Sequence, residues 1–247
     1  MGRKKAAAQK KMSVGHWLLI AAGVAVLVAV IVGMALFLEK SEPDPTQPSR
    51  DTTVKVEITQ TDVMDLGKGL RVSKIGKYAG IFLEDGSNAP VSNLLMIILE
   101  NTSKQDLQLA RFSLEYEDFT AEFEATNLPA GESVVLLERN RHAYVEGTPK
   151  TSKLATTVFF ENKMDLMTDT FRVSGTNGQL VLENISDTDI SGDIFVYYKY
   201  SAGDLLYGGM TYRARFSGGV DAGEKSAVIA THYDPDSCEI IQITAGG

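Results

Sequence analysis

Reactive and cross-linking residues are scarce in this chain. It contains one cysteine, Cys238, one tryptophan and three histidines. A single cysteine excludes an internal disulfide and a zinc site built from cysteines. The motifs H-E-x-x-H, G-x-S-x-G and G-x-x-x-x-G-K-[ST] do not occur, so the sequence offers no signature of a zinc protease, an α/β-hydrolase or a P-loop enzyme. We therefore expect a protein that is not an enzyme and binds no cofactor.

Positive charge is also scarce beyond the N-terminus. Residues 1–38 hold five bases and no acid, which leaves 19 bases against all 32 acids in residues 39–247. A region with this excess of negative charge repels phosphate backbones. The charge distribution therefore argues against nucleic acid as a partner.

One long hydrophobic segment is present. Residues 17–38, WLLIAAGVAVLVAVIVGMALFL, contain no charge, and as a helix they reach roughly 33 Å, enough to cross the hydrocarbon core of a bilayer. Five bases precede this segment and acids follow it, so the positive-inside rule predicts a basic cytoplasmic tail over residues 1–16. A cleaved signal peptide is the alternative, but its apolar core normally spans only about 7–15 residues. We expect an uncleaved transmembrane helix over residues 17–38 whose partner is the lipid bilayer.

The next segment is rich in proline. Residues 41–53, SEPDPTQPSRDTT, contain three of the seven prolines of the chain and no bulky apolar residue. Such a sequence cannot build a core, and its prolines stiffen it. We expect residues 39–53 to form a stalk that lifts an extracellular folded part off the cell membrane.

Beyond the stalk the hydrophobic pattern has a period of two. Apolar and polar residues alternate over 111–117, 119–126 and 212–216, as in strands with one buried face. The run LLMIIL at 94–99 is apolar throughout, which is typical of a central strand packed on both sides. No amphipathic helix is evident, although TDVMDLG at 61–67 would allow a short helical turn. We expect an all-β ectodomain.

Two short sequences each occur twice. LENTS at 99–103 returns as LENIS at 182–186, and AGE at 130–132 returns at 222–224. The shift between the copies is 83 residues at the first mark and 92 at the second, so the second copy carries about nine extra residues. The simplest location for them is SAGDLLYGG at 201–209, as a longer hairpin.

This order of strands and turns predicts two tandem immunoglobulin-like β-sandwich domains, residues 54–150 and 151–247. The boundary is open between 140 and 170, because the strand TTVFF could close the first domain or open the second. Aligning the LEN marks places Phe112 opposite Phe195. In each copy, the asparagine is expected to turn the chain, through left-handed backbone geometry and bonds to its own backbone. Asn101 and Asn184 also fit N-x-S, the acceptor pattern for glycans.

Two further stretches carry the resemblance to a known family. FSLEYED at 112–118 and IFVYYKY at 194–200 are similar in style to the FxLYD-type, immunoglobulin-like repeat of bacteria. Together with the basic N-terminus, single span and proline-rich stalk, they resemble uncharacterised single-pass surface proteins of Gram-positive bacteria. Glu115 stands before Tyr116, and Val196 stands where the family pattern carries leucine. The resemblance implies a β-sandwich and no particular activity.

The sequence contains one weak metal-site pattern. In DTDISGD, Asp187, Asp189 and Ser191 match the first, third and fifth positions of a calcium loop. Position twelve would be Tyr198, where the motif needs glutamate, and flanking helices are missing. We favour a polar hairpin turn. HYDPDSC at 232–238 also gathers metal-ligand types, but the proline between its two aspartates favours a turn there as well.

The densest basic stretch outside the N-terminal tail is ERNRHAYVEGTPKTSK at 138–153. It collects five residues that could draw an anionic polymer or an acidic partner: Arg139, Arg141, His142, Lys150 and Lys153. The alternative is a solvated linker whose charges have no binding role.

These observations predict a membrane-anchored extracytoplasmic module of the cell surface that serves interaction or structure and is not catalytic. Its expected partners, besides the bilayer, are a cell-wall polymer or another envelope protein. An accessory subunit of a membrane or envelope complex is the alternative, and an extracellular enzyme is the third class.

Overall fold

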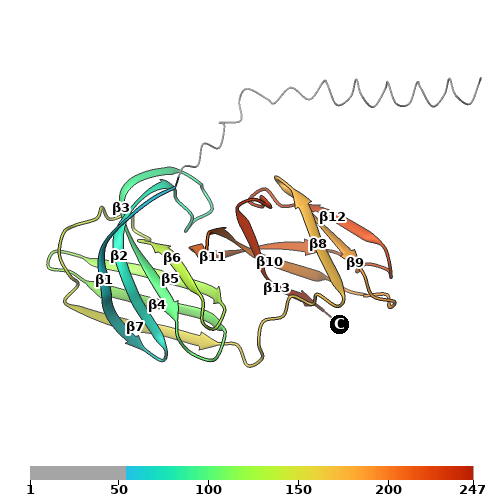
Figure 1. The fold of residues 1–247 in the computed structure, drawn as a ribbon, viewed down its shortest axis with the longest axis horizontal. Helices are drawn as coiled ribbons and strands as arrows, with labels where there is room; N and C mark the ends of the chain where they lie inside the picture. Colours follow the sequence, from blue (N-terminus) through green and yellow to red (C-terminus); the bar gives the residue numbers. More distant parts are fainter. Residues whose placement is uncertain (1–53, 247) are drawn as a thin grey trace, which may run out of the picture. The chain divides into compact units, whose positions relative to one another are not determined.

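The computed structural model describes residues 54–246, which form thirteen β-strands and no helix (Figure 1). The predicted all-β character of this part of the chain is confirmed. Residues 54–246 include no helix with the length and hydropathy needed for a membrane span. The predicted tail, transmembrane helix and stalk, residues 1–16, 17–38 and 39–53, lie outside the described residues.

The first half of the described chain contains seven strands. They are β1 (Lys55–Gly67), β2 (Leu70–Ile81), β3 (Pro90–Asn101), β4 (Leu107–Glu115), β5 (Thr120–Leu128), β6 (Ser133–Leu137) and β7 (Thr151–Phe159). β1, β2, β3 and β6 are consecutive neighbours in one sheet, and β4 lies between β5 and β7 in another. β1 covers residues 61–67, where the sequence allowed a short helical turn, so that expectation was wrong.

The second half contains six strands. They are β8 (Phe171–Thr176), β9 (Gln179–Asn184), β10 (Ile194–Ala202), β11 (Leu205–Phe216), β12 (Lys225–Ile229) and β13 (Cys238–Ala245). β9 lies between β8 and β12, and β10 lies between β11 and β13. The two halves therefore share one pairing order, in which β2-β3-β6 corresponds to β8-β9-β12 and β5-β4-β7 to β11-β10-β13.

β7 settles the alternative that the sequence left open. It pairs antiparallel with β4 from Glu115↔Thr151 to Leu107↔Phe159. The strand therefore closes the first half, and the connection to the second half runs through residues 160–170 rather than dividing at 150/151.

β3 is packed on both faces, as its apolar sequence predicts. Leu95, Ile97 and Leu99 belong to the core between β2-β3-β6 and the facing β4 and β5. The alternate residues Leu94, Met96 and Ile98 belong to a separate core on the other face of the same sheet. All six are at most 3% exposed.

The β10–β11 hairpin joins the two halves. It contains the predicted extra residues, and in β11 Leu206 and Tyr207 pair in parallel with Val134 and Val135 of β6. This contact produces one seven-stranded sheet in the order β1-β2-β3-β6-β11-β10-β13. Side chains of the hairpin also pack against the separate core that contains Leu94, Met96 and Ile98, which we call the outer core of the first half.

The two LEN marks form nearly identical hydrogen-bonded turns. Asn101 and Asn184 are 1% and 0% exposed. Nδ2 of Asn101 donates to the carbonyls of Gln105 (2.9 Å) and Leu128 (3.0 Å), and Asn184 repeats the pattern toward Thr188 (2.8 Å) and Val220 (2.9 Å). In both copies Oδ1 accepts bonds from the backbone and the hydroxyl of the serine two residues later. Each asparagine therefore ties a strand end to a second turn.

The backbone geometry at these turns corrects part of the prediction. Neither Asn101 nor Asn184 has a positive φ; the left-handed residues are Gly131 (φ 86°) and Gly223 (φ 76°) of the AGE turns. Glycine is required there because a Cβ disfavours this region of backbone space. The asparagines act through their side chains and through backbone bonds to the AGE turns, in which Gly131 N donates to Asn101 O (2.8 Å) and Gly223 N to Asn184 O (2.9 Å).

The alignment of Phe112 with Phe195 was wrong, because the two residues lie on opposite faces of their strands relative to the core. Phe112 is 3% exposed and lies in the first core, whereas Phe195 is half-buried and alternates with the buried residues Ile194 and Val196. The distance from the LEN turn to the corresponding core residue of the next strand therefore differs between the copies by an odd number of residues. A shift of one residue moves every side chain to the opposite face of a strand.

Candidate functional site

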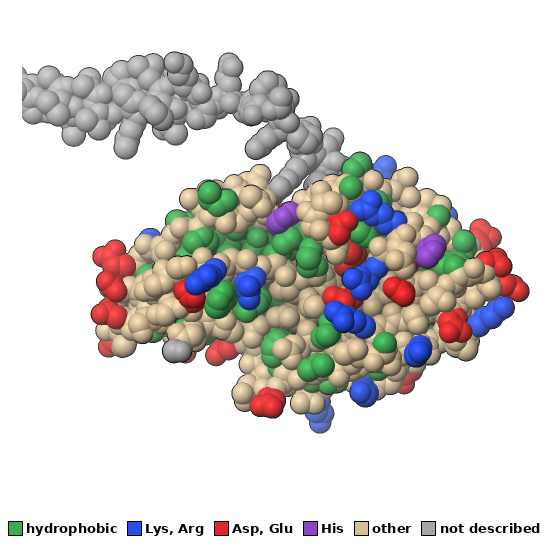
Figure 2. All heavy atoms as spheres, turned by 180° about the vertical axis from the view of Figure 1, so that it is seen from behind, with side chains coloured by type: hydrophobic (Ala, Val, Ile, Leu, Met, Phe, Trp, Pro, Cys, Tyr) green, Lys and Arg blue, Asp and Glu red, His purple; other side chains and the backbone are tan. Residues whose placement is uncertain are grey.

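The predicted basic residues lie at separate places around one end of the first half. Arg139, Arg141 and His142 follow β6, Lys150 precedes β7 and Lys153 lies within it. Four of them are close to acids, in the pairs Arg139–Glu124 (3.3 Å), Arg141–Asp85 (2.7 Å), His142–Glu138 (3.2 Å) and Lys150–Glu117 (3.5 Å). Figure 2 shows Lys and Arg side chains interspersed with Asp and Glu on the face that it presents. The basic stretch is therefore largely neutralised by its neighbours, and its binding role stays a prediction.

The predicted calcium residues belong to the second LEN turn. Oδ1 of Asp189 accepts a bond from Ala222 N (2.9 Å), and Oδ1 of Asp187 accepts one from Thr188 Oγ1 (3.2 Å). Ser191 follows the isolated bridge between Ile190 and Val220. Among residues 54–246, no three or more His, Cys, Asp or Glu side chains gather in a way that could hold a metal ion. The Asp189 carboxylate therefore links the AGE turn to the LEN turn by a hydrogen bond.

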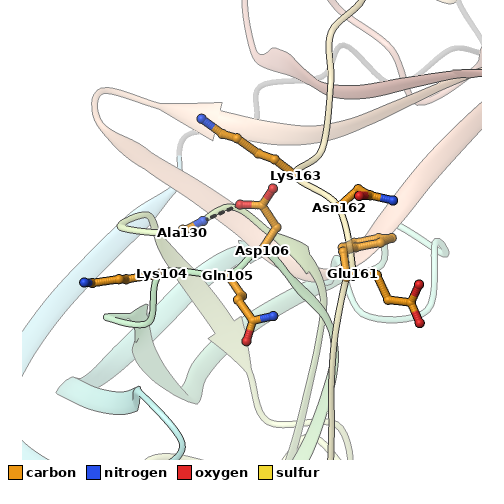
Figure 3. Close-up of a pocket in the computed structure, with 8 residues that line it drawn as sticks. Lys104, Gln105, Asp106, Ala130, Glu161, Asn162 and Lys163 are labelled. Atoms are coloured by element: carbon orange, nitrogen blue, oxygen red, sulfur yellow. Dashed lines mark hydrogen bonds between the residues drawn. The ribbon is translucent and has the colours of Figure 1, made fainter.

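A surface hollow of about 240 Å³ lies beside the corresponding turn of the first half (Figure 3). Its lining comes from the β3–β4 turn, the β5–β6 turn and the segment after β7: Lys104, Gln105, Asp106, Ala130, Phe160, Glu161, Asn162 and Lys163. In Figure 3 the amino groups of Lys104 and Lys163 lie on one side of Asp106, while Glu161 points the other way.

Asp106 determines what the hollow can do. It is 3% exposed, and its carboxylate accepts bonds from Ala130 N (2.8 Å) through Oδ1 and from Met164 N (2.6 Å) through Oδ2. Its carbonyl also accepts a bond from Phe160 N (2.9 Å). Both carboxylate oxygens are engaged in holding the connection between the halves, so Asp106 is poorly placed to act as a base or a metal ligand. Only the two exposed lysines could attract a ligand, and it would be an anion.

The connection between the halves contains two charged residues that the sequence analysis missed, the half-buried Glu84 and the fully buried Lys199. Glu84 accepts bonds from Leu137 N and Gly209 N, both 2.8 Å. Lys199 is 0% exposed, and its Nζ donates three bonds of 3.0 Å to the carbonyls of Gly208, Gly209 and Met210. Burial raises the pKa of Glu84 and lowers that of Lys199, and the attraction between the two groups opposes both shifts. The signal in the sequence was a lysine within the apolar strand IFVYYKY.

An aromatic cluster adjoins this pair. Tyr212 stacks on His232 with ring centroids 4.5 Å apart and on Tyr198 at 5.6 Å. The His232 ring also contacts Asn88 of the first half, with 3.3 Å between Nδ2 and Nδ1, and Cys238 Sγ lies 3.4 Å from the His232 carbonyl oxygen. His232 and Cys238, considered above as metal-ligand types, are thus parts of the packing between the halves.

Comparisons with protein-family models, with curated proteins and with solved structures found no match to this chain.

Proposed function

We propose that the protein is a non-catalytic, single-pass module of the cell surface that presents a binding face at a fixed distance from the membrane. The apolar segment 17–38, with bases before it and a proline-rich stalk after it, supports the anchor and the orientation. The observation that carries the proposal is the seven-stranded sheet, which continues from the first half into the second through β6 and β11.

This shared sheet favours a rigid spacer over two domains that move independently. Domains that meet through small polar interfaces are expected to move relative to one another. Here backbone pairing, an apolar core and the hydrogen bond from Gly209 N to the Glu84 carboxylate all cross the connection. A stalk followed by such a connected body would hold the outermost surface away from the bilayer.

Each half also supports an immunoglobulin-like assignment. In that fold the first, second and fifth strands share one sheet, and the third and sixth share the other. The first half has this relation when its strands are counted from β2, with β2-β3-β6 in one sheet and β4-β7 in the other. The second half has it in β8-β9-β12 and β10-β13. The matching turns and pairing orders are the basis for proposing that the halves descend from one duplicated unit.

The proposal is tested by adding protease to intact cells that make the full chain. Residues 39–247 should be degraded while a short N-terminal fragment stays with the membrane. Protection of the C-terminal part until the membrane is permeabilised would contradict the topology. Crosslinking on the same cells tests the alternative, because an accessory subunit should be recovered in a fixed ratio with one membrane complex.

A further inference from the structure

The outer face of β11-β10-β13 carries aromatic and basic side chains in two rows. Arg215 lies opposite Phe195, which lies opposite Thr244, and Arg213 lies opposite Tyr197, which lies opposite Gln242. All six alternate with core residues along their strands, so they point away from the core of the second half. The guanidinium of Arg213 leans diagonally over the Phe195 ring, 4.8 Å from its centroid.

The packing of the protein does not require an aromatic residue at Phe195. The core of the second half is filled from the alternate positions Ile194, Val196 and Tyr198, and Phe195 takes part in none of the hydrophobic cores of the described residues. Tyr197 differs from Phe195, since it also packs against the first core.

Arg213 differs from the other bases of the second half in having no acidic side chain of the described residues close to it. Residues 171–246 contain five bases and ten acids. Lys199 is buried, Arg172 and Lys225 both pair with Glu183, and Arg215 pairs with Asp193. Within the described part of the chain, Arg213 has no carboxylate within 4.0 Å. An exposed cation without a counter-charge, on an otherwise acidic half, is complementary to a carboxylate brought by another molecule.

The spacing of the two arginines matches one kind of partner. Arg213 and Arg215 are two residues apart on β11, so their side chains leave the same face about 6.8 Å apart. An extended peptide presents alternate side chains at the same interval. We propose that the face formed by Phe195, Arg213 and Arg215 binds an extended acidic segment of a partner protein, with Asp or Glu at alternate residues.

The ion pair between Arg215 and Asp193 does not prevent a ligand from binding to Arg215. Its N–O distance is 2.6 Å, but the two side chains are 59% and 33% exposed. Exposed ion pairs contribute little to stability, so Arg215 can exchange Asp193 for a carboxylate of the ligand at small cost. Arginine and aromatic side chains are also the residues that most often dominate the energetics of protein interfaces.

The test uses the purified full chain in detergent and two fluorescent peptides, one of alternating Glu and Thr and one of the same composition with Glu and Thr in separate blocks. The alternating peptide should bind about tenfold more tightly, and added salt should weaken its binding. Arg213→Ser should reduce that affinity about tenfold, because one charge-assisted contact is lost. Phe195→Leu, which removes the ring that supports Arg213, should reduce it several-fold.

A matched variant makes the result specific. Arg172→Ser removes an arginine from the other sheet of the same half and should leave peptide binding unchanged. An unchanged melting temperature identifies folded variants. Equal affinity for the two peptides, undiminished binding by folded Arg213→Ser, or equally tight binding of polygalacturonate would overturn the proposal. The proposal deepens the interaction function above, but this assay does not depend on topology, so the two can fail separately.

Discussion

Replacing Lys199 by methionine should destabilise the protein far more than removing any exposed lysine. Methionine fills a similar volume but cannot donate to the three carbonyls that Nζ bonds at 3.0 Å. The substitution also removes the attraction of Lys199 for the half-buried Glu84 carboxylate, which keeps its bonds from Leu137 N and Gly209 N and the weaker attraction of Arg139.

The expected magnitude follows from both losses. Removing one member of a buried ion pair costs about 3–5 kcal/mol, and this figure includes part of the cost of acceptors left without a donor. For a folded region of this size, about 4 kcal/mol corresponds to a fall in melting temperature of roughly 8–16 °C. Glu84→Gln keeps the shape of the side chain but turns an NH₂ group toward a backbone donor, and should cost about 2–3 kcal/mol.

Urea denaturation followed by circular dichroism measures these changes. The double variant Glu84→Gln/Lys199→Met contains no uncompensated charge, so its loss should fall short of the sum of the single losses by more than about 1 kcal/mol. Lys150→Met, which breaks an exposed pair with Glu117, is the matched control and should cost less than about 1 kcal/mol. If Lys199→Met behaves like this control, or the single losses simply add, the two groups are not a coupled pair.

Three other predictions concern buried polar groups and close packing. Asn184→Asp should lower the free energy of unfolding by about 2–4 kcal/mol, because the buried amide loses its donors to two carbonyls; an unchanged urea midpoint would contradict this. Gly209→Ala should lower the melting temperature well below that of Gly203→Ala, since a Cβ at Gly209 collides with the Glu124 carbonyl, while a Cβ at Gly203 meets no atom and alanine there is disfavoured only by the left-handed backbone (φ 60°). Burial raises the pKa of Tyr116 from 10.0 to about 12, so the folded state holds this proton more tightly than the unfolded chain. Its stabilising contribution is present below about pH 10 and is lost toward pH 12, and phenolate absorbance should show Tyr116 ionising above pH 10 or together with unfolding.

Local periodicity was enough to predict β3, β4, β5 and the end of β11. The alternation at 111–117 and the unbroken apolar run at 94–99 depend only on which face of a strand meets the core, and β4 and β3 have the predicted burial. The turns were predicted as structural features for a similar reason, because Asn and Gly have well-defined roles where strands end.

Local sequence patterns could not predict the register of the strands or which distant residues contact one another. Aligning the two copies on LEN could not show that Phe195 faces away from the core of the second half, since the alignment had no information about which residues face the core. Glu84 and Lys199 are 115 positions apart in the sequence, and the residues around each of them do not predict that the two interact. The basic stretch at 138–153 was visible as composition, but its acidic partners Asp85, Glu117 and Glu124 come from other strands and loops.

The longer hairpin explains why the two halves should not be treated as independent. In the first half, Val135 and Leu137 of β6 are 0% and 1% exposed. Leu205 and Tyr207 of the β10–β11 hairpin pack against the same outer core, and β11 occupies the free edge of β6. Residues 54–170 produced alone would therefore expose an apolar face and an unpaired strand edge, both of which promote association. We expect this fragment to bind a hydrophobic dye and to aggregate on size-exclusion chromatography, whereas residues 54–246 should not. A monomeric fragment that melts cooperatively without binding dye would show that the first half is complete without the hairpin.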